Sequence, residues 1–341
     1  MRVLVTGGAG FIGSHYVRTA IDGGYPDLAD ASIVVLDKLT YAGNLANLRE
    51  VESDDRFEFV RGDIADAPLV DSLLRDVDHV VHFAAESHVD RSIEEGAEFV
   101  RTNVTGTQTL LEAAKRHRVS RFVHVSTDEV YGSIASGSWD EEQPLDPTSP
   151  YSASKAGSDL IALAYARTFR LPVMVTRCSN NYGPYQFPEK VIPLFVTNLL
   201  TGGTVPLYGD GRNVRDWIHV ADHCRAVEAV RAGGRPGEIY NVAGEAELSN
   251  RELTRRLLRA CGCGWEQVRL VADRLAHDRR YSVDATKIKV ELGFVPSVDI
   301  DEGLRATVAW FRENRQWWEP LRDPVSLGPK ADNAEQPAIH A

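Results

Sequence analysis

Short apolar segments alternate with longer amphipathic segments over the first half of the chain. The apolar segments are rich in Val and Ile and only a few residues long, which is typical of buried strands. The segments between them repeat their apolar residues with the period of a helix. The predicted strands are residues 2–7, 32–39, 57–64, 79–85, 121–128 and 172–180, and the predicted helices include 11–24, 104–118 and 151–170.

Strands joined by helices form βαβ units, which predict a parallel sheet. We therefore expect an α/β fold with a doubly wound, Rossmann-like parallel sheet at residues 1–180. Gly, Pro, aromatic and charged residues become frequent afterwards, which indicates a smaller mixed C-terminal lobe at 181–322. Within it, 237–244 has the pattern of a strand that returns to the main sheet. Residues 323–341 have no periodicity, and we expect a disordered tail.

Composition excludes several classes of protein. The 341 residues carry a formal net charge of −11, whereas a nucleic-acid binder usually carries a basic surface. We find no apolar stretch of the roughly 18 residues that a membrane span needs, and no secretory signal at the start. The four cysteines (Cys178, Cys224, Cys261 and Cys263) have no zinc-site spacing, so we expect free thiols and no metal. We expect a cytoplasmic protein that binds neither nucleic acid nor membrane.

A glycine loop, TGGAGFIG, lies between the first predicted strand and the first predicted helix. Gly7, Gly10 and Gly13 allow a sharp turn, a close approach of a pyrophosphate to the backbone, and tight packing of the helix on the strand. The helix N-terminus then offers amides to the phosphates. Asp37 ends the second strand, where a carboxylate accepts hydrogen bonds from ribose hydroxyls and repels a 2′-phosphate. The pattern predicts a dinucleotide site that prefers NAD to NADP.

Tyr151 and Lys155 are four residues apart in YSASK, which places them on one face of the predicted helix. A nearby ammonium stabilises a phenolate, so we expect the pKa of Tyr151 to fall toward neutrality. Such a tyrosine can accept a hydroxyl proton while a hydride leaves for nicotinamide. Ser126 and Thr127 end the preceding strand and offer a hydroxyl to the same site.

Two adjacent acids, Asp128 and Glu129, follow the apolar strand RFVHV. In a straight strand they would point to opposite faces, so we expect the chain to leave strand geometry there. Neighbouring carboxyls repel each other's ionisation, which separates their pKa values and suits one to act as an acid and the other as a base. A solvated turn is the alternative reading of this dipeptide.

The motifs together resemble one enzyme family. TGGAGFIG, DKLTYAGNL, AAESHVDRSI, STDEVYG, SPYSASKA, NNYGPYQFPEKVIP, RDWIHVADH and HDRRY are similar to the dTDP-glucose 4,6-dehydratases of the extended short-chain dehydrogenase/reductase superfamily. The resemblance implies that bound NAD is regenerated within each turnover of a dTDP-hexose, and that the subunits form homodimers. It implies that Tyr151 serves the C4 hydroxyl, Glu129 is the base at C5, Asp128 is the acid at C6, and Thr127 binds the C4 oxygen.

The family pattern also assigns contacts to the cofactor and to the substrate. The expected cofactor contacts are Gly7, Gly10, Phe11, Ile12, Gly13, Asp37, Lys38, Leu39, Thr40, Asp63, Ile64, Phe83, Ala84, Ala85, Ser87, Thr102, Tyr151, Lys155 and Asn181. The expected substrate contacts are Ser87, His88, Thr127, Asn180, Glu189, Lys190, Val191, Pro206, Leu207, Tyr208, Arg215, Asn250, Arg274, His277 and Tyr281.

Several residues have a structural reading beside the functional one. Asp63 and Asn250 can be helix N-caps, His277 can make a structural hydrogen bond, and Asp90 can pair with Arg91. The chain departs from the family where D-R-P-G is replaced by D-R-L-A, at Asp273–Ala276.

The alternative functions are another nucleotide-sugar enzyme and a non-catalytic NAD-binding regulator. A UDP-hexose 4-epimerase needs no acid pair, and UDP-glucuronate decarboxylases and GDP-mannose dehydratases tend to have T-S-E in place of T-D-E. A regulator would have lost Tyr151 or Lys155. The helices expected at the dimer interface are about 99–116 and 151–169.

Overall fold

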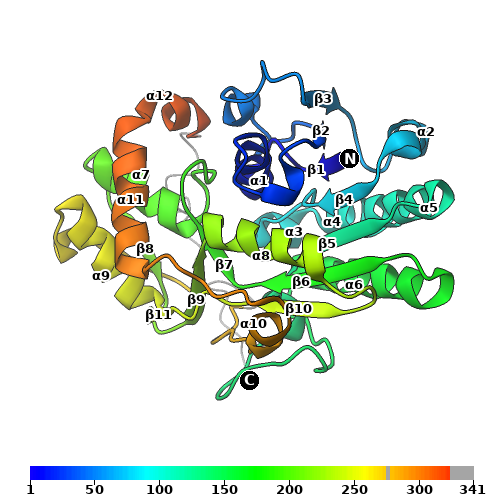
Figure 1. Cartoon of the computed structure of the whole chain (residues 1–341). Coiled ribbons are helices and arrows are strands. Elements are labelled where there is room, and N and C mark those ends of the chain that lie inside the picture. Colours follow the sequence, from blue (N-terminus) through cyan, green and yellow to red (C-terminus); the bar gives the residue numbers. More distant parts are fainter. Residues whose placement is uncertain (274–276, 323–341) are drawn as a thin grey trace.

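A parallel sheet forms the centre of the protein (Figure 1). The computed structural model describes residues 1–273 and 277–322. The expectations for Arg274, Leu275 and Ala276 and for the 323–341 tail therefore lie outside the described residues. Within the described part, seven strands pair in the order β10-β6-β5-β4-β1-β2-β3, and all of these pairs are parallel. The predicted α/β fold class is confirmed.

The strands are short, apolar and mostly buried, as expected for a parallel sheet covered on both faces. In β5, for example, six of the seven residues are buried. β10 pairs with β6, so residues within 237–244 return to the main sheet. The strands are β1 (Arg2–Thr6), β2 (Ser32–Asp37), β3 (Phe57–Arg61), β4 (His79–His82), β5 (Arg121–Thr127), β6 (Val173–Cys178) and β10 (Ile239–Val242).

Helices cover both faces of the sheet and bury separate cores against it. On one face Val17 of α1 and Val227 of α8 belong to a core with Val35 of β2. On the other face Leu110 of α5 and Ala162 of α6 belong to a second core. The helices are α1 (Phe11–Ile21), α2 (Ala67–Leu73), α5 (Thr107–His117), α6 (Pro150–Phe169) and α8 (Val220–Gly233).

The helix predicted at 104–118 is only partly α-helical. α3 (Val89–Glu94) and α4 (Gly96–Phe99) lead into a π-helical segment, η4 (Val100–Gly106), and α5 follows without a break. The prediction of one regular helix from 104 was therefore wrong for its first turn. Thr107 Oγ1 donates to the Asn103 backbone oxygen at 2.6 Å, and hydroxyls that bond back to a carbonyl in this way bend helices.

The second half of the chain forms most of a smaller lobe, at the left in Figure 1. It has its own core, which includes Phe195, Leu257, Val308 and Trp318. Its sheets contain β7 (Asn180–Tyr182), β9 (Val214–His219) and β11 (Glu247–Ser249), and β8 (Val205–Tyr208) with β12 (Val268–Val271). Its helices are α7 (Val191–Leu200), α9 (Asn250–Cys261), α11 (Ile300–Glu313) and α12 (Arg315–Trp318). α10 (Thr286–Leu292) instead packs against β10 of the main sheet and against α8 (Figure 1).

The chain order of the strands fixes where a ligand can bind. From β1 the chain proceeds to β2 and β3 on one side, and then to β4, β5 and β6 on the other. The loops after β1 and β4 therefore diverge, and such a switch point leaves a crevice at the carboxyl ends of the strands. Separately, no helix in the described ranges is long and apolar enough to cross a membrane.

Candidate active site

The glycine loop has the backbone geometry that its sequence predicts. Gly7 has a φ of +70°, and a Cβ there would lie 2.6 Å from the Ala84 backbone nitrogen. A Cβ on Gly13 would lie 2.3 Å from the Gly7 carbonyl oxygen. Only glycine fits these two close approaches. α1 begins at Phe11 directly after Gly10, so its first amides are available to an anionic ligand.

Asp37 lies at the end of β2, beside the glycine loop. One carboxylate oxygen accepts from the Ala9 amide at 2.9 Å, and the other from the Leu39 amide at 2.8 Å. Burial raises the pKa of the carboxyl, and these backbone donors lower it. The two bonds fix the carboxylate at the pocket, where it can accept from a ribose.

Asp63 does not cap a helix, so that alternative was wrong. The N-cap of α2 is Asp66, whose side chain accepts from the Leu69 amide. Asp63 instead forms ion pairs with Lys38 at 3.0 Å and with Arg101 at 3.2 Å. The Asp63 side chain therefore joins the end of β3 to the end of β2 at the pocket wall.

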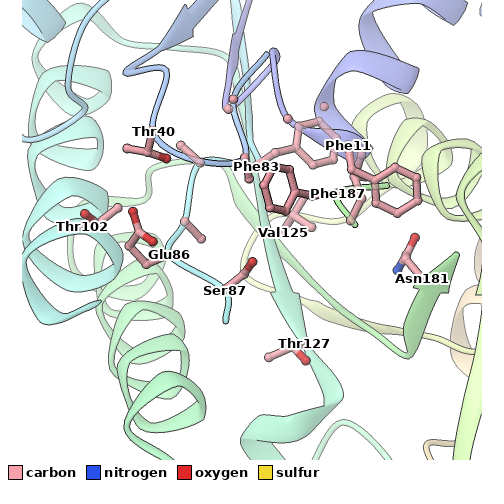
Figure 2. A pocket seen from close by; sticks show the side chains of 18 of the residues that line it. Phe11, Thr40, Phe83, Glu86, Ser87, Thr102, Val125, Thr127, Asn181 and Phe187 are labelled. Atoms are coloured by element: carbon pink, nitrogen blue, oxygen red, sulfur yellow. The ribbon is translucent and has the colours of Figure 1, made fainter. Parts of the chain in front are cut away.

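One pocket gathers nearly all of the expected cofactor residues (Figure 2). The rings of Phe11, Phe83 and Phe187 lie together at one side of it, and Thr127 lies farther along, at the end of β5. Leu39 is outside the lining. The expected cofactor residues that line the pocket are Gly7, Gly10, Phe11, Ile12, Gly13, Asp37, Lys38, Thr40, Asp63, Ile64, Phe83, Ala84, Ala85, Ser87, Thr102, Tyr151, Lys155 and Asn181.

The acid pair lies where β5 ends and a 3₁₀ turn, η5 (Asp128–Tyr131), begins. The chain therefore leaves strand geometry at this point, as its sequence predicts. Glu129 lines the pocket, while Asp128 is only 2% exposed. Burial, and next the Glu129 carboxylate, hold the pKa of Asp128 well above its ordinary value. The pair is thus asymmetric, with Asp128 in the environment of a protonated acid.

Tyr151 and Lys155 project into the pocket from the first turns of α6. The helix starts at a capping box in which the Ser149 and Ser152 hydroxyls bond reciprocally to each other's backbone amides. Lys155 Nζ donates to the Val125 backbone oxygen of β5 at 2.9 Å. The helix start and the strand end therefore hold these two side chains beside Thr127 and Glu129.

The expected fall in the pKa of Tyr151 was wrong. Burial, and next the Glu129 carboxylate, hold that pKa well above its ordinary value. The prediction considered only the ammonium of Lys155, whereas the tertiary structure also removes water and brings a carboxylate close. Tyr151 is therefore held as a neutral phenol by these surroundings.

The expected substrate residues fall into two groups. Ser87, Thr127, Asn180, Glu189 and Lys190 line the same pocket. The rest of the described set lies outside its lining. His88 is the N-cap of α3, with its Nε2 3.8 Å from Glu189, and Val191 begins α7. The others lie around β8, β9 and the start of α9: Pro206, Leu207, Tyr208, Arg215, Asn250, His277 and Tyr281.

Two members of the second group lie near the acid pair. The Arg215 guanidinium is 4.2 Å from the centre of the Tyr281 ring. The positive charge of Arg215 acts on Asp128, and the Glu129 carboxylate acts on Tyr281. Arg215 and Tyr281 therefore lie next to the pocket, on the side where Asp128 and Glu129 are found.

Two structural alternatives in the second group have clear outcomes. Asn250 is not the N-cap of α9, because that position belongs to Ser249, whose hydroxyl accepts from the Glu252 amide. His277 does make a hydrogen bond, with its Nδ1 2.5 Å from Asp273 Oδ1.

Sequence reasoning missed an aromatic and charged cluster at the pocket edge. The rings of Tyr41 and Phe187 meet edge to face at 5.5 Å, and both residues line the pocket. Arg91 lies over Tyr41 and forms an ion pair with Glu189 at 3.3 Å. DKLTYAGNL and NNYGPYQFPEKVIP contain Tyr41, Phe187 and Glu189, but neither segment is periodic, so neither sequence could show that the two meet.

Further residues complete the lining of the pocket. Cys178, which was expected to be a free thiol, is free and buried and lines the pocket, and Asn181 Nδ2 lies 3.5 Å from its sulfur. Burial raises the pKa of the Cys178 thiol, so the thiol stays protonated. The further lining residues are Leu36, Tyr41, Ala42, Gly43, Gly62, Glu86, Val125, Ser126, Ser179, Gln186 and Phe187.

These features define a nucleotide-binding enzyme of the short-chain dehydrogenase/reductase type, and a comparison with protein families agrees. Residues 4–307 match the family model described as GDP-mannose 4,6 dehydratase. The chain therefore belongs to this family, within the extended short-chain dehydrogenase/reductase superfamily, and the resemblance inferred from the motifs is confirmed.

Individual relatives are more specific. The chain is 62% identical over 323 residues to dTDP-glucose 4,6-dehydratase of Streptomyces antibioticus, covering 94% of this chain and 96% of the relative. It is 59% identical over 324 residues to the Streptomyces niveus enzyme of that name, covering 95% and 96%. The crystal structure of DesIV (dTDP-glucose 4,6-dehydratase) from Streptomyces venezuelae with NAD and TYD bound superposes with a TM-score of 0.93. Its sequence identity is 64%, over 94% of this chain and 100% of that one.

Proposed function

We propose that this chain is a dTDP-glucose 4,6-dehydratase that converts dTDP-glucose to dTDP-4-keto-6-deoxyglucose. The observation that carries the proposal is the position of Asp128 and Glu129 beside Tyr151 and Lys155, at the carboxyl end of β5. Tyr151 and Lys155 suit any oxidation at C4, whereas eliminating water needs a further acid and base. The relatives named dTDP-glucose 4,6-dehydratase support the same assignment.

The cofactor is NAD. The glycine loop, the start of α1 and the Asp37 carboxylate fit a dinucleotide, and related structures contain NAD. When bound, NAD supplies a positively charged ring that accepts the C4 hydride and later returns it to C6. Lys38, Asp63 and the other lining residues expected from the motifs form the wall around it.

Each catalytic side chain has one proton to move. Tyr151 must first lose its own proton, and the Lys155 ammonium and the positive charge of bound NAD would favour the resulting phenolate. This phenolate then accepts the C4 hydroxyl proton. Thr127 holds the C4 oxygen. The C4 ketone acidifies the C5 proton, which Glu129 removes, while Asp128 protonates the departing C6 hydroxyl. The raised pKa of Asp128 suits this role, because the group must hold its proton beside an ionised neighbour.

The substrate spans the boundary between the lobes. The sugar occupies the pocket at Ser87, Asn180, Glu189 and Lys190, and residues 1–180 hold the cofactor. Residues 181–322 mainly hold the nucleotide, and Arg215 is suited to a diphosphate because of its fixed fork of donors. His88 is a further candidate for contact with the sugar, and the remaining candidates for substrate contact are Val191, Pro206, Leu207, Tyr208, Asn250, Arg274, His277 and Tyr281.

The chain works as a homodimer in the cytoplasm. Val100 on η4 and Leu160 and Phe169 on α6 are large apolar side chains that are 53%, 59% and 49% exposed. They occur on the helices expected at the dimer interface, where a helix bundle would cover them. All four cysteines are free, which fits a reducing compartment.

Incubating the purified protein with dTDP-glucose tests the proposal. We expect a 4-keto-6-deoxy product, seen by its absorbance in alkali and by NMR, without added reductant and with no net change in bound NAD. A C4 epimer with no keto product would instead make the chain an epimerase. A protein that binds NAD but leaves every nucleotide sugar unchanged would favour the regulator.

A further inference from the structure

A buried charged cluster lies directly behind Lys155. Asp159 follows Lys155 by one turn of α6 and has no solvent exposure. Arg177 of β6 donates from Nε to Asp159 Oδ2 at 2.9 Å, and the Arg177 side chain is 2% exposed. His124 Nε2 of β5 lies 3.2 Å from Asp159 Oδ1. One carboxylate thus joins the central strands to the helix that carries Tyr151 and Lys155.

Most of the titratable side chains around Lys155 are either uncharged or positively charged. Burial lowers the pKa of Lys155, and the Asp159 carboxylate is the first influence that raises it. Burial also lowers the pKa of His82 and His124, so both imidazoles are neutral. The titratable or charged groups around Lys155 are Tyr151 and Asp159 of α6, His82 of β4, His124 of β5, Arg177 and Cys178 of β6, and Glu129 of η5.

An ammonium in such a place needs a counter-charge. Removing an amine from water favours its neutral form, unless a fixed negative group lies near. Glu129 lies on the pocket side and is assigned to proton transfer, so its charge changes during turnover. Asp159 is shielded, bonded to Arg177 and ionised, since His124 and Arg177 outweigh burial and hold its pKa at about 2.

We propose that Asp159 is a positioning residue for Lys155, whose carboxylate keeps the lysine amine protonated throughout the catalytic cycle. Arg177 and His124 hold that carboxylate on α6, one helical turn after Lys155, while Lys155 Nζ is held by the Val125 backbone oxygen. The inference rests on the proposed role of Lys155 in stabilising the Tyr151 phenolate. A purely structural ion pair between Asp159 and Arg177 would stabilise the fold but leave the titration of Lys155 unchanged.

The direct test follows the protonation of Lys155 in the NAD-loaded protein by NMR of carbon-labelled lysine, with K155M to assign its resonance. The variants are D159N and the double variant D159N/R177M, which leaves no unpaired buried charge at the pair. The control is E228Q/R231M, which neutralises another buried Arg–carboxylate pair, on α8. We expect the wild-type resonance to remain that of an ammonium at neutral pH. We expect its midpoint to fall by about one pH unit or more in both Asp159 variants, and to stay unchanged in the control.

The kinetic test measures the pH dependence of NADH formation in a single turnover. We expect the alkaline limit of this rate to move to lower pH by the same amount in the Asp159 variants. The NMR titration needs no sugar, so a failure of the proposed activity would not affect it. The proposal is overturned if wild-type Lys155 is already neutral at neutral pH, or if a folded Asp159 variant keeps the wild-type midpoint. If D159N alone does not fold, the double variant and the wild-type titration decide.

Discussion

The guanidinium carbon of Arg91 lies 3.8 Å from the centre of the Tyr41 ring. The same guanidinium reaches Glu189, and the Tyr41 ring meets Phe187. The contacts therefore join α3, the loop after β2 and the segment before α7 at the edge of one pocket. One arginine side chain thus contacts residues of two segments that are far from it in the sequence.

We expect R91M to release bound NAD faster than the wild type, by about threefold to tenfold. A cation–π contact and a partly exposed ion pair are together worth about 1 kcal/mol, and about 1.4 kcal/mol corresponds to tenfold in affinity. Displacement of labelled NAD by excess unlabelled NAD measures the rate. R255M is the matched control, because Arg255 also pairs with a glutamate and both arginine side chains are 49% exposed. Equal release from R91M and R255M would contradict the prediction.

The acid pair separates oxidation from elimination. We expect D128N/E129Q to reduce bound NAD with dTDP-glucose but to form no 4-keto-6-deoxy product, because the variant keeps Tyr151 and Lys155 but lacks both groups that remove water. Stopped-flow NADH absorbance and product NMR measure the two steps. D301N/E302Q alters the same dipeptide on the exposed first turn of α11 and should turn over normally. Full turnover by D128N/E129Q would remove both acids from the mechanism.

The raised pKa of Asp128 predicts a cost in stability. A carboxyl whose folded pKa lies above its unfolded value, about 3.9, favours folding at low pH, and this contribution is lost as pH rises through the folded pKa. D128N removes the titration, so we expect its melting temperature to exceed that of the wild type at neutral pH by about 1–2 °C, which corresponds to roughly 1 kcal/mol for a chain of this length. The difference should shrink toward zero near pH 4. Calorimetry across this range gives the test, and a difference that grows on acidification would contradict it.

The exposed side chain of Leu160 predicts an effect on assembly. L160E places a charge on the outer face of α6, and we expect it to shift a dimer toward monomer, because burying an unpaired charge costs several kcal/mol. Sedimentation velocity measures the change. L270E alters a leucine that is 65% exposed, compared with 59% for Leu160, but lies on β12. We expect L270E to remain dimeric, so an equal effect of both changes would argue against α6 as the interface.

Sequence was most informative where a local pattern determines structure. The apolar runs predicted the strands of the parallel sheet, and the spacing of Gly7, Gly10 and Gly13 predicted a strand, a tight loop and a helix. Both depend on neighbours in the chain. The departure of the chain from strand geometry at Asp128 and Glu129 could also be predicted, because adjacent side chains of a straight strand point to opposite faces and could not serve one site.

Properties that depend on tertiary contacts could not be predicted from the sequence. The pKa of Tyr151 is raised rather than lowered, because burial and Glu129 outweigh what the Y-x-x-x-K spacing suggests. Tyr41 and Phe187 meet although 145 residues of chain separate them. The π-helical turn at Val100–Gly106 also has no signature in the apolar period.

The return of β10 to the central sheet has a consequence for dissecting the protein. β6 is buried along its whole length, and β10 supplies its outer neighbour from the second half of the chain. A fragment ending near residue 180 would expose the edge of β6, a strand that is otherwise buried, with open hydrogen-bonding groups, which is a template for aggregation. Residues 1–180 therefore do not form a complete folding unit. A truncated chain intended for grafting or domain exchange must also include the strand at Ile239–Val242.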